Sequence, residues 1–118
     1  MSKTSETKHT PGPWVQHGTQ VTDADGYEIA DAQETCILLG YSEKLGIDHW
    51  ANDDRASRDR SEQEAEANAR LIAAAPQMLE ALQDVISNDD LSRNDWDRET
   101  MRVLRAVQAA IAKATGNA

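Results

Sequence analysis

The stretch EAEANARLIAAAPQMLEAL at residues 64–82 decides the fold class of the second half of this chain. It is rich in Ala, Leu and Glu, which are strong helix formers. Ser61 is a fair N-cap, and Glu64 three residues later completes a capping-box pattern. Pro76 lies within the stretch and lacks a backbone donor, so it either kinks this helix or starts a second helix at its first turn.

Apolar residues recur at helical spacing along this stretch and again near the C-terminus. The first helix is predicted to end at residues 88–90. Its apolar residues form one broad stripe: Leu71, Ile72, Ala75, Leu79, Leu82 and Ile86. A last helix is predicted from a cap at Asn94 or Asp95 to about Thr115, with Gly116 as its C-terminal stop. Its predicted buried face consists of Met101, Leu104, Val107 and Ile111.

Strand-like segments precede the helical half. We predict a strand at residues 15–22, an Asp-Gly turn at residues 23–26, a partner strand at residues 27–30 and a third strand at residues 35–40. Strands followed by helices predict an α+β fold, with a small N-terminal antiparallel sheet over residues 13–40 and then two C-terminal helices.

Residues 42–60 lack periodicity, and we expect a long loop there, with a short strand at residues 47–50 as an alternative. The 118 residues suffice for one small domain, predicted at residues 10–118 behind a flexible tail at residues 1–9. The hydrophobic fraction is 39% with no Phe, so the core is thin and a homo-oligomer is expected.

The net charge is −9, and residues 42–66 carry eight acids against four bases. Long-range repulsion therefore disfavours nucleic acid and anionic membranes as direct partners. The single cysteine, Cys36, excludes an internal disulfide and suits a reducing cytosol. The N-terminus has no apolar run typical of a signal peptide, and no stretch is long enough to span a bilayer, so we expect a cytoplasmic protein.

Catalytic and metal-binding patterns are weak in this sequence. The possible metal ligands are scattered without paired spacing, so no metal or cofactor is expected: His9, His17, His49 and Cys36. The adjacent carboxylates follow an Asn in loop-like sequence and read as solvated loop or cap residues: Asp53, Asp54, Asp89 and Asp90. Without a nucleophile elbow, a P-loop or a dinucleotide fingerprint, we expect no enzyme, and a small hydrolase is the lowest-ranked function.

Arginines carry the stronger signal, because the guanidinium group binds phosphate in a bidentate manner. Arg70, Arg102 and Arg105 lie on predicted helices, and ordered elements hold a site firmly. Asn68 is unusual in an alanine-rich helix and either faces solvent or aims a hydrogen-bonding group at a ligand. These four residues form the predicted ligand-binding set, although most arginines have nearby acids. The next candidates are the loop arginines Arg55, Arg58 and Arg60.

Two motifs and a turn carry a family resemblance: HTPGPW at residues 9–14, Asp-Gly followed by Ile-Ala within residues 25–30, and ANARLIAAAP at residues 67–76, followed by LEAL. Over residues 9–87 the chain resembles a large group of small phage and prophage proteins. Within that group, N-terminal strands followed by two helices are similar to the Thoeris anti-defence sponge proteins of phages. Those proteins bind cyclic ADP-ribose signals, assemble as dimers and hexamers, and do no chemistry on the ligand.

The resemblance implies a phage counter-defence protein of the host cytoplasm that sequesters a cyclic nucleotide-type immune signal, a cyclic ADP-ribose isomer or a cyclic oligonucleotide, without cleaving it. Arginines would hold the diphosphate, an aromatic the base, and Asn68 or backbone groups would give specificity. An alternative of another class is an acidic protein inhibitor that mimics nucleic acid and blocks a host factor, which the charge of −9 favours.

Overall fold

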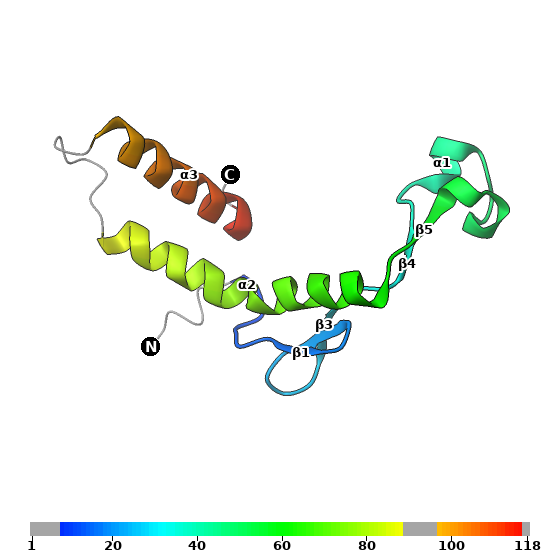
Figure 1. Ribbon diagram of the computed structural model, residues 1–118, viewed down its shortest axis with the longest axis horizontal. Helices are drawn as coiled ribbons and strands as arrows, with labels where there is room; N and C mark the ends of the chain where they lie inside the picture. The colour runs from blue at the N-terminus through cyan, green and yellow to red at the C-terminus, as the bar shows by residue number, and fades with distance from the viewer. Residues whose placement is uncertain (1–7, 89–96, 117–118) are drawn as a thin grey trace. The chain divides into compact units, whose positions relative to one another are not determined.

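The computed structural model describes residues 8–88 and 97–116. Its internal contacts divide the chain into two compact units. We call Val15–Ala73 the sheet unit, and the described residues of Met1–Trp14 and Ala74–Ala118 the helical unit. Figure 1 shows the elements of both, with strands before the two long helices, so the predicted α+β class is confirmed. The expected tail at residues 1–9 and the single domain at residues 10–118 stay predictions.

The first sheet is antiparallel with the order β1-β2-β3. Its strands are β1 (Val15–His17), β2 (Gln20–Thr22) and β3 (Glu28–Asp31). The single strand predicted at residues 15–22 is wrong, because the chain reverses at Gly18 and the two halves pair with each other. Gly18 has φ of 64°, a left-handed conformation that glycine adopts at little steric cost. The side-chain amide of Gln16 donates to the Gly18 carbonyl at 2.9 Å and braces this turn.

The predicted turn at residues 23–26 is confirmed. The Asp23 Oδ1 atom accepts hydrogen bonds from the backbone N–H groups of Asp25 and Tyr27, each at 2.9 Å. This pattern is an Asx turn, which explains why Asp begins the segment. Strand β3 begins one residue after the predicted start, at Glu28, and the Tyr27 side chain is 74% exposed.

A second, two-stranded sheet pairs β4 (Thr35–Ile37) with β5 (Ser57–Asp59). The third strand was predicted to join the first sheet and to reach residue 40, and both expectations are wrong. Antiparallel pairing sets Cys36 opposite Arg58, which lies 22 positions later in the chain. Local sequence patterns carry no information about such a distant partner, so the second sheet could not be foreseen.

The loop predicted at residues 42–60 is largely structured. It contains, in addition to β5, three short helical elements: α1 (Tyr41–Leu45), η2 (Trp50–Asn52) and η3 (Asp54–Ala56). The alternative strand at residues 47–50 is also wrong. Single turns are too short to show periodicity, and local caps define them: Gly46 ends α1 with φ of 68°, and His49 accepts a hydrogen bond from the backbone N–H of Ala51.

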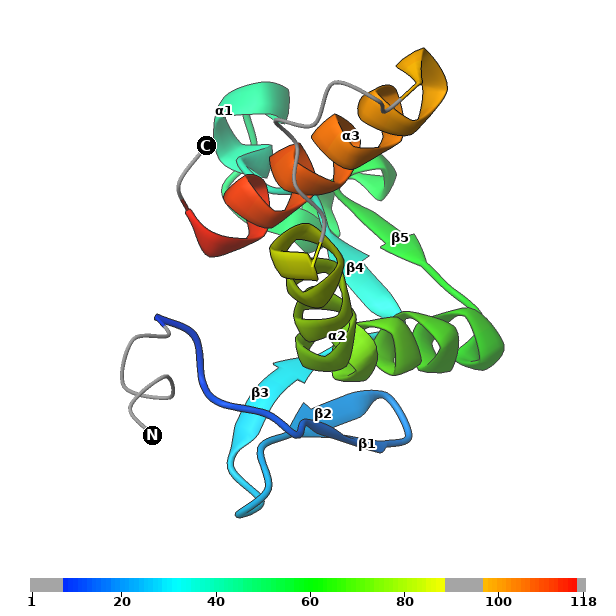
Figure 2. The same cartoon turned by 90° about the vertical axis from the view of Figure 1, so that its left-hand side faces the viewer.

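The long helix α2 (Glu62–Asn88) runs through Pro76 as one element, so the alternative of a second helix starting there is wrong. Its start is as predicted, because Ser61 Oγ accepts the backbone N–H of Glu64 at 3.1 Å. Within the sheet unit, the first turns of α2 lie beside the β1–β3 sheet in both views (Figures 1 and 2). The Gln16 amide reaches the Glu66 carbonyl at 3.0 Å and ties strand to helix.

Small residues dominate the buried set of the sheet unit. Among its residues, those less than a tenth exposed are Val21, Thr22, Ala56, Ala65 and Ala69. Ala65 and Ala69 are four positions apart and share one face of α2, which lets the helix approach its neighbours closely. The predicted apolar stripe of this helix is only partly buried, since Leu71 is 61% exposed.

In the helical unit, helix α3 (Arg98–Thr115) starts later than predicted. Its cap is Asp97, whose carboxylate accepts the backbone N–H of Thr100 at 2.7 Å, so a cap at residue 94 or 95 is wrong. That backbone hydrogen bond lowers the pKa of the Asp97 carboxyl. Leu104 is 6% exposed within the predicted apolar face, and Gly116 ends the helix with φ of 81° as predicted.

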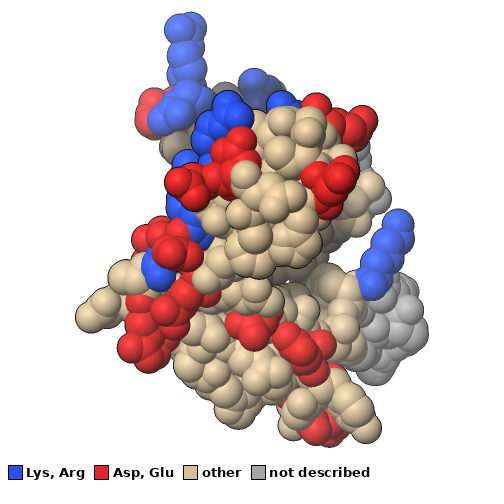
Figure 3. All heavy atoms as spheres, turned by 90° about the vertical axis from the view of Figure 1, so that its right-hand side faces the viewer, with Lys and Arg blue, Asp and Glu red and all other residues tan. Residues whose placement is uncertain are grey.

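Charge is spread over the surface. Figure 3 shows one face on which Asp and Glu side chains form several separate groups, with Lys and Arg side chains beside some of them.

Candidate functional site

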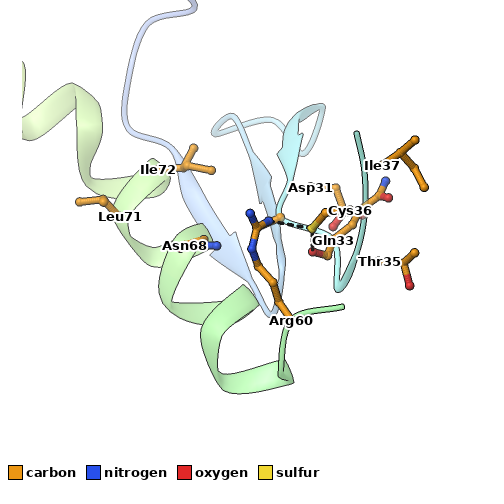
Figure 4. Close-up of a pocket in the computed structure, with 10 residues that line it drawn as sticks. Asp31, Gln33, Thr35, Cys36, Ile37, Arg60, Asn68, Leu71 and Ile72 are labelled. Carbon is orange, nitrogen blue, oxygen red and sulfur yellow. Dashed lines mark hydrogen bonds between the residues drawn. The ribbon is translucent and has the colours of Figure 1, made fainter. Parts of the chain in front are cut away.

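An open hollow of about 570 Å³ lies in the sheet unit, between the segment that carries β4 and the first turns of α2. Figure 4 shows its side chains. The lining residues combine an arginine, a carboxylate, two amides, a hydroxyl and a thiol with apolar side chains: Asp31, Ala32, Gln33, Thr35, Cys36, Ile37, Arg60, Asn68, Leu71 and Ile72.

Arg60 is the cation that lines this hollow, and its backbone position is fixed by sheet pairing. Its N–H group donates to the Glu34 carbonyl at 2.7 Å, which extends the β4–β5 ladder by one bond beyond β5. The residue also comes directly before the Ser61 cap of α2. Strand pairing on one side and a capped helix on the other therefore hold the base of the Arg60 side chain.

Cys36 meets the guanidinium group of Arg60. The Arg60 Nη1 atom lies 2.7 Å from the Cys36 Sγ atom and donates to it. The thiol in turn donates to the Gln33 carbonyl at 3.3 Å. Figure 4 shows the guanidinium between Cys36 and the Asn68 side chain of α2. A half-buried thiol thus contacts one end of the guanidinium group in the hollow that both residues line.

Asn68 supplies the second polar group, from the face of α2 that turns toward the hollow. It is half-buried, and Leu71 and Ile72 follow at three and four positions, so the three residues share that face. An amide carries both donors and acceptors, and the aliphatic side chains beside it add apolar surface to the hollow. This combination suits a ligand that has a flat polar ring and an anionic group.

The other loop arginines differ from Arg60. Arg55 binds the Asp53 carboxylate through two nitrogens, at 3.1 and 2.7 Å. Hydrogen bonds from the side chain and then the backbone of Arg55 lower the pKa of Asp53 to about 2. Arg58 is exposed on β5 and does not line the hollow.

The structure does not gather the four predicted site residues into this hollow. Asn68 lines it, whereas Arg70, two positions later on the helix, is exposed and does not. Arg102 and Arg105 are exposed residues of the helical unit, and Arg102 forms an ion pair with Glu99 one turn earlier. Contact of Arg70, Arg102 or Arg105 with a ligand stays a prediction.

From the sequence, Arg60 is only a second-rank candidate, Cys36 is considered as a metal ligand and not as a partner of an arginine, and Gln33 has no predicted role. One local signal was available, because an arginine directly before a capping box is held by an ordered helix start. The approach of Cys36 to Arg60 had no local signal, since it depends on strand pairing across 24 positions.

The helical unit contains a second hollow, of about 1240 Å³, whose lining mixes polar and apolar side chains and includes both sequence motifs. Pro11, Gly12 and Pro13 line it from the HTPGPW motif, and Pro76 from the second motif. A Cβ atom built on Gly12 would lie 2.9 Å from the Cβ of Pro76. The glycine and the helix proline therefore pack directly together, which gives the two motifs a shared structural role.

Two further classes of site were searched in the part of the chain that the structure describes. Across residues 8–88 and 97–116, no group of three His, Cys, Asp or Glu residues could hold a metal ion. Within the same residues, no helix combines the length and apolar character required to cross a membrane.

These observations define a small α+β protein with an arginine- and asparagine-lined hollow beside its longest helix. The family model of Salmonella phage P22 protein Y8K6 matches residues 1–118, and the chain belongs to this phage protein family. Comparisons with curated proteins and with solved structures give no match.

Proposed function

We propose that this phage protein is a counter-defence protein of the host cytoplasm that binds a cyclic nucleotide-type immune signal and stores it without cleavage. Membership in a phage family supports the setting. The observation that carries the proposal is the convergence of the Arg60 guanidinium and the Asn68 amide on one hollow.

The chemistry of binding follows from the lining. Arg60 donates charge-assisted hydrogen bonds to a phosphate, as guanidinium groups do in many phosphate sites. Asn68 and Gln33 offer amide groups to the edge of a base, and Ile72 offers an aliphatic surface to its ring. The net charge of −9 opposes anion approach only at long range, because charges beyond about 8–10 Å are screened at physiological salt.

The first experiment is a thermal-shift panel of cyclic ADP-ribose isomers and cyclic oligonucleotides. A bound ligand stabilises the folded protein, so the melting temperature rises with ligand concentration. At a ligand concentration a hundred times the dissociation constant, the free energy of unfolding increases by about 2.7 kcal/mol. Chromatography of the ligand after denaturation of the complex tests storage, and the expected result is an unchanged molecule. A cleaved ligand, or a panel without any shift, contradicts the proposal.

Variants then test the site. Arg60→Met removes the charge and keeps most of the side-chain length, and we expect it to weaken binding by about ten- to a hundredfold, the loss of a charge-assisted contact. Arg55→Met is the matched control, because Arg55 lies outside the hollow. Alanine variants of Arg70, Arg102 and Arg105 test the set predicted from sequence. If ligand affinity falls in these three variants and is unchanged in Arg60→Met, the binding site lies outside the hollow.

We propose homo-oligomers as well, because the described residues bury few large apolar side chains. Light scattering of the protein at micromolar concentration tests this, and a stable monomer contradicts it.

A second candidate is an acidic inhibitor that occupies a basic surface of a host protein. The net charge of −9 and the acid-rich residues 42–66 favour it. Such an inhibitor would ignore the ligand panel and bind a basic protein with an affinity that falls steeply as salt is added.

A further inference from the structure

The guanidinium group of Arg60 is shared between two neighbours. Its Nη1 atom contacts Cys36, and its Nε atom lies 3.5 Å from the Glu64 carboxylate, one helical turn along α2. The Arg60 side chain is 36% exposed and that of Glu64 is 58% exposed. An arginine has five N–H donors, so these two contacts leave donors available on the solvent side of the hollow.

We propose that Glu64 competes with the incoming phosphate for Arg60, so that this carboxylate sets how tightly the hollow binds an anion. The inference rests on the function proposed above, and it makes Glu64 a positioning residue that acts through Arg60. An exposed ion pair at this spacing is weak, worth about two- to fivefold in an equilibrium constant. A phosphate that forms two guanidinium hydrogen bonds can therefore displace it.

Cys36 provides a built-in reporter of where the guanidinium lies. It is the single cysteine of the chain, so any thiol reaction reports this position alone. Alkylation uses the sulfur atom as the nucleophile, so its rate responds to the charged guanidinium group in contact with that atom. In the structure the guanidinium contacts Cys36 and Glu64 at the same time. We expect loss of the Glu64 pair to strengthen the contact with the sulfur and to speed alkylation, and an anion that takes the guanidinium to slow it.

The experiment measures the rate of Cys36 alkylation by iodoacetamide in the full chain, with Glu64→Gln, Arg60→Met and the double variant. We expect Glu64→Gln to speed alkylation by about two- to fivefold, the size of the lost ion pair. Arg60→Met should slow it. In the Arg60→Met background, Glu64→Gln should leave the alkylation rate unchanged, because the effect of Glu64 requires the guanidinium group. The control, Arg55→Met, should react like the parent.

Pyrophosphate is the anion probe in the same assay. It should slow alkylation of the parent and have no effect on Arg60→Met. In Glu64→Gln, the pyrophosphate concentration that gives half of the full decrease in alkylation rate should be about two- to fivefold lower than in the parent, because the competing carboxylate is gone. This gain of affinity is a result that loss of a purely structural residue would not give.

Two outcomes overturn the inference. The first is a Glu64→Gln effect that is equally large with and without Arg60→Met, which would be a simple charge effect on the thiol. The second is that pyrophosphate does not slow alkylation of Cys36 in the parent, or that Glu64→Gln requires the same pyrophosphate concentration as the parent for half of the effect. Failure of the proposed function has a different signature, in which pyrophosphate protects Cys36 but no cyclic nucleotide does.

Discussion

The sheet unit and the helical unit are stabilised in different ways. Of the described residues that are less than a tenth exposed, five belong to the sheet unit and one, Leu104, to the helical unit. The sheet unit combines two small sheets with the alanine face of α2, and it contains the hollow with Arg60 and Asn68. The helical unit relies on half-buried side chains and on the contact between Gly12 and Pro76.

This difference indicates where precise positions are held. Hydrogen-bonded strand pairs and capped helix starts restrain backbone positions, and a binding site must be held within about 0.5 Å of its working geometry. A pair of helices with one well-buried residue among those that the structure describes has fewer packing contacts to fix it. The predictions below test this contrast in order of decreasing effect.

The largest effect is expected from Leu104→Ala. Removing the one side chain of the helical unit that is well buried in the described residues should cost about 2–5 kcal/mol. Hydrogen exchange of α3 amides measures this cost locally. The adjacent Val103→Ala is the control, since Val103 is 46% exposed and should change stability by less than about 0.5 kcal/mol. Equal effects of the two variants would show that α3 packs on a different face.

Val21→Ala tests the sheet unit. Val21 is fully buried on β2, and its truncation should cost about 2–3 kcal/mol. Amide exchange in β2 and β3 reports the loss. Val15→Ala on the paired strand β1 is the matched control, because Val15 is 40% exposed. If exchange in α3 accelerates as much as in the sheet, the two units unfold together and the contrast between them fails.

Gly12→Ala should destabilise the helical unit by about 1–3 kcal/mol, the usual cost of forcing an extra methyl group into a packed contact. The new Cβ atom would meet the Pro76 ring at 2.9 Å. A graded series makes the test specific: Gly12→Val should cost more than Gly12→Ala in urea unfolding followed by helicity. A neutral Gly12→Val would mean that the two motifs do not pack tightly in solution.

The smallest effect concerns the cap of α3. The folded pKa of Asp97 is lowered, so its stabilising contribution is present above the unfolded value near 3.9 and is lost as pH falls through the folded pKa. Protection of the Thr100 amide should therefore decrease on acidification below about pH 4. Asp97→Asn keeps a capping side chain but cannot titrate, so its protection should not follow this pH dependence. Identical pH profiles would assign the effect to other carboxyls.

Much of the fold could be predicted from local sequence. The N-cap at Ser61, the turn at Asp23 and the stop at Gly116 use side-chain and glycine chemistry that acts within a few residues. The segment at residues 42–60 could not be predicted, because its helices last a single turn. The strand at residues 15–22 was misread because a Gly18 turn without an Asn-Gly or Asp-Gly pair gives a weak hairpin signal.

The sequence by itself determined that strands precede helices, that residues 62–88 are helical and that Arg and Asn side chains are available near the start of that helix. Only the tertiary structure decided which of them meet. The pairing of β4 with β5 brings Cys36 to Arg60, and helical spacing turns Asn68 toward the same hollow while Arg70 stays exposed. The physical reason is that helix periodicity and caps are local, whereas a site is built from contacts between residues that are distant in the chain.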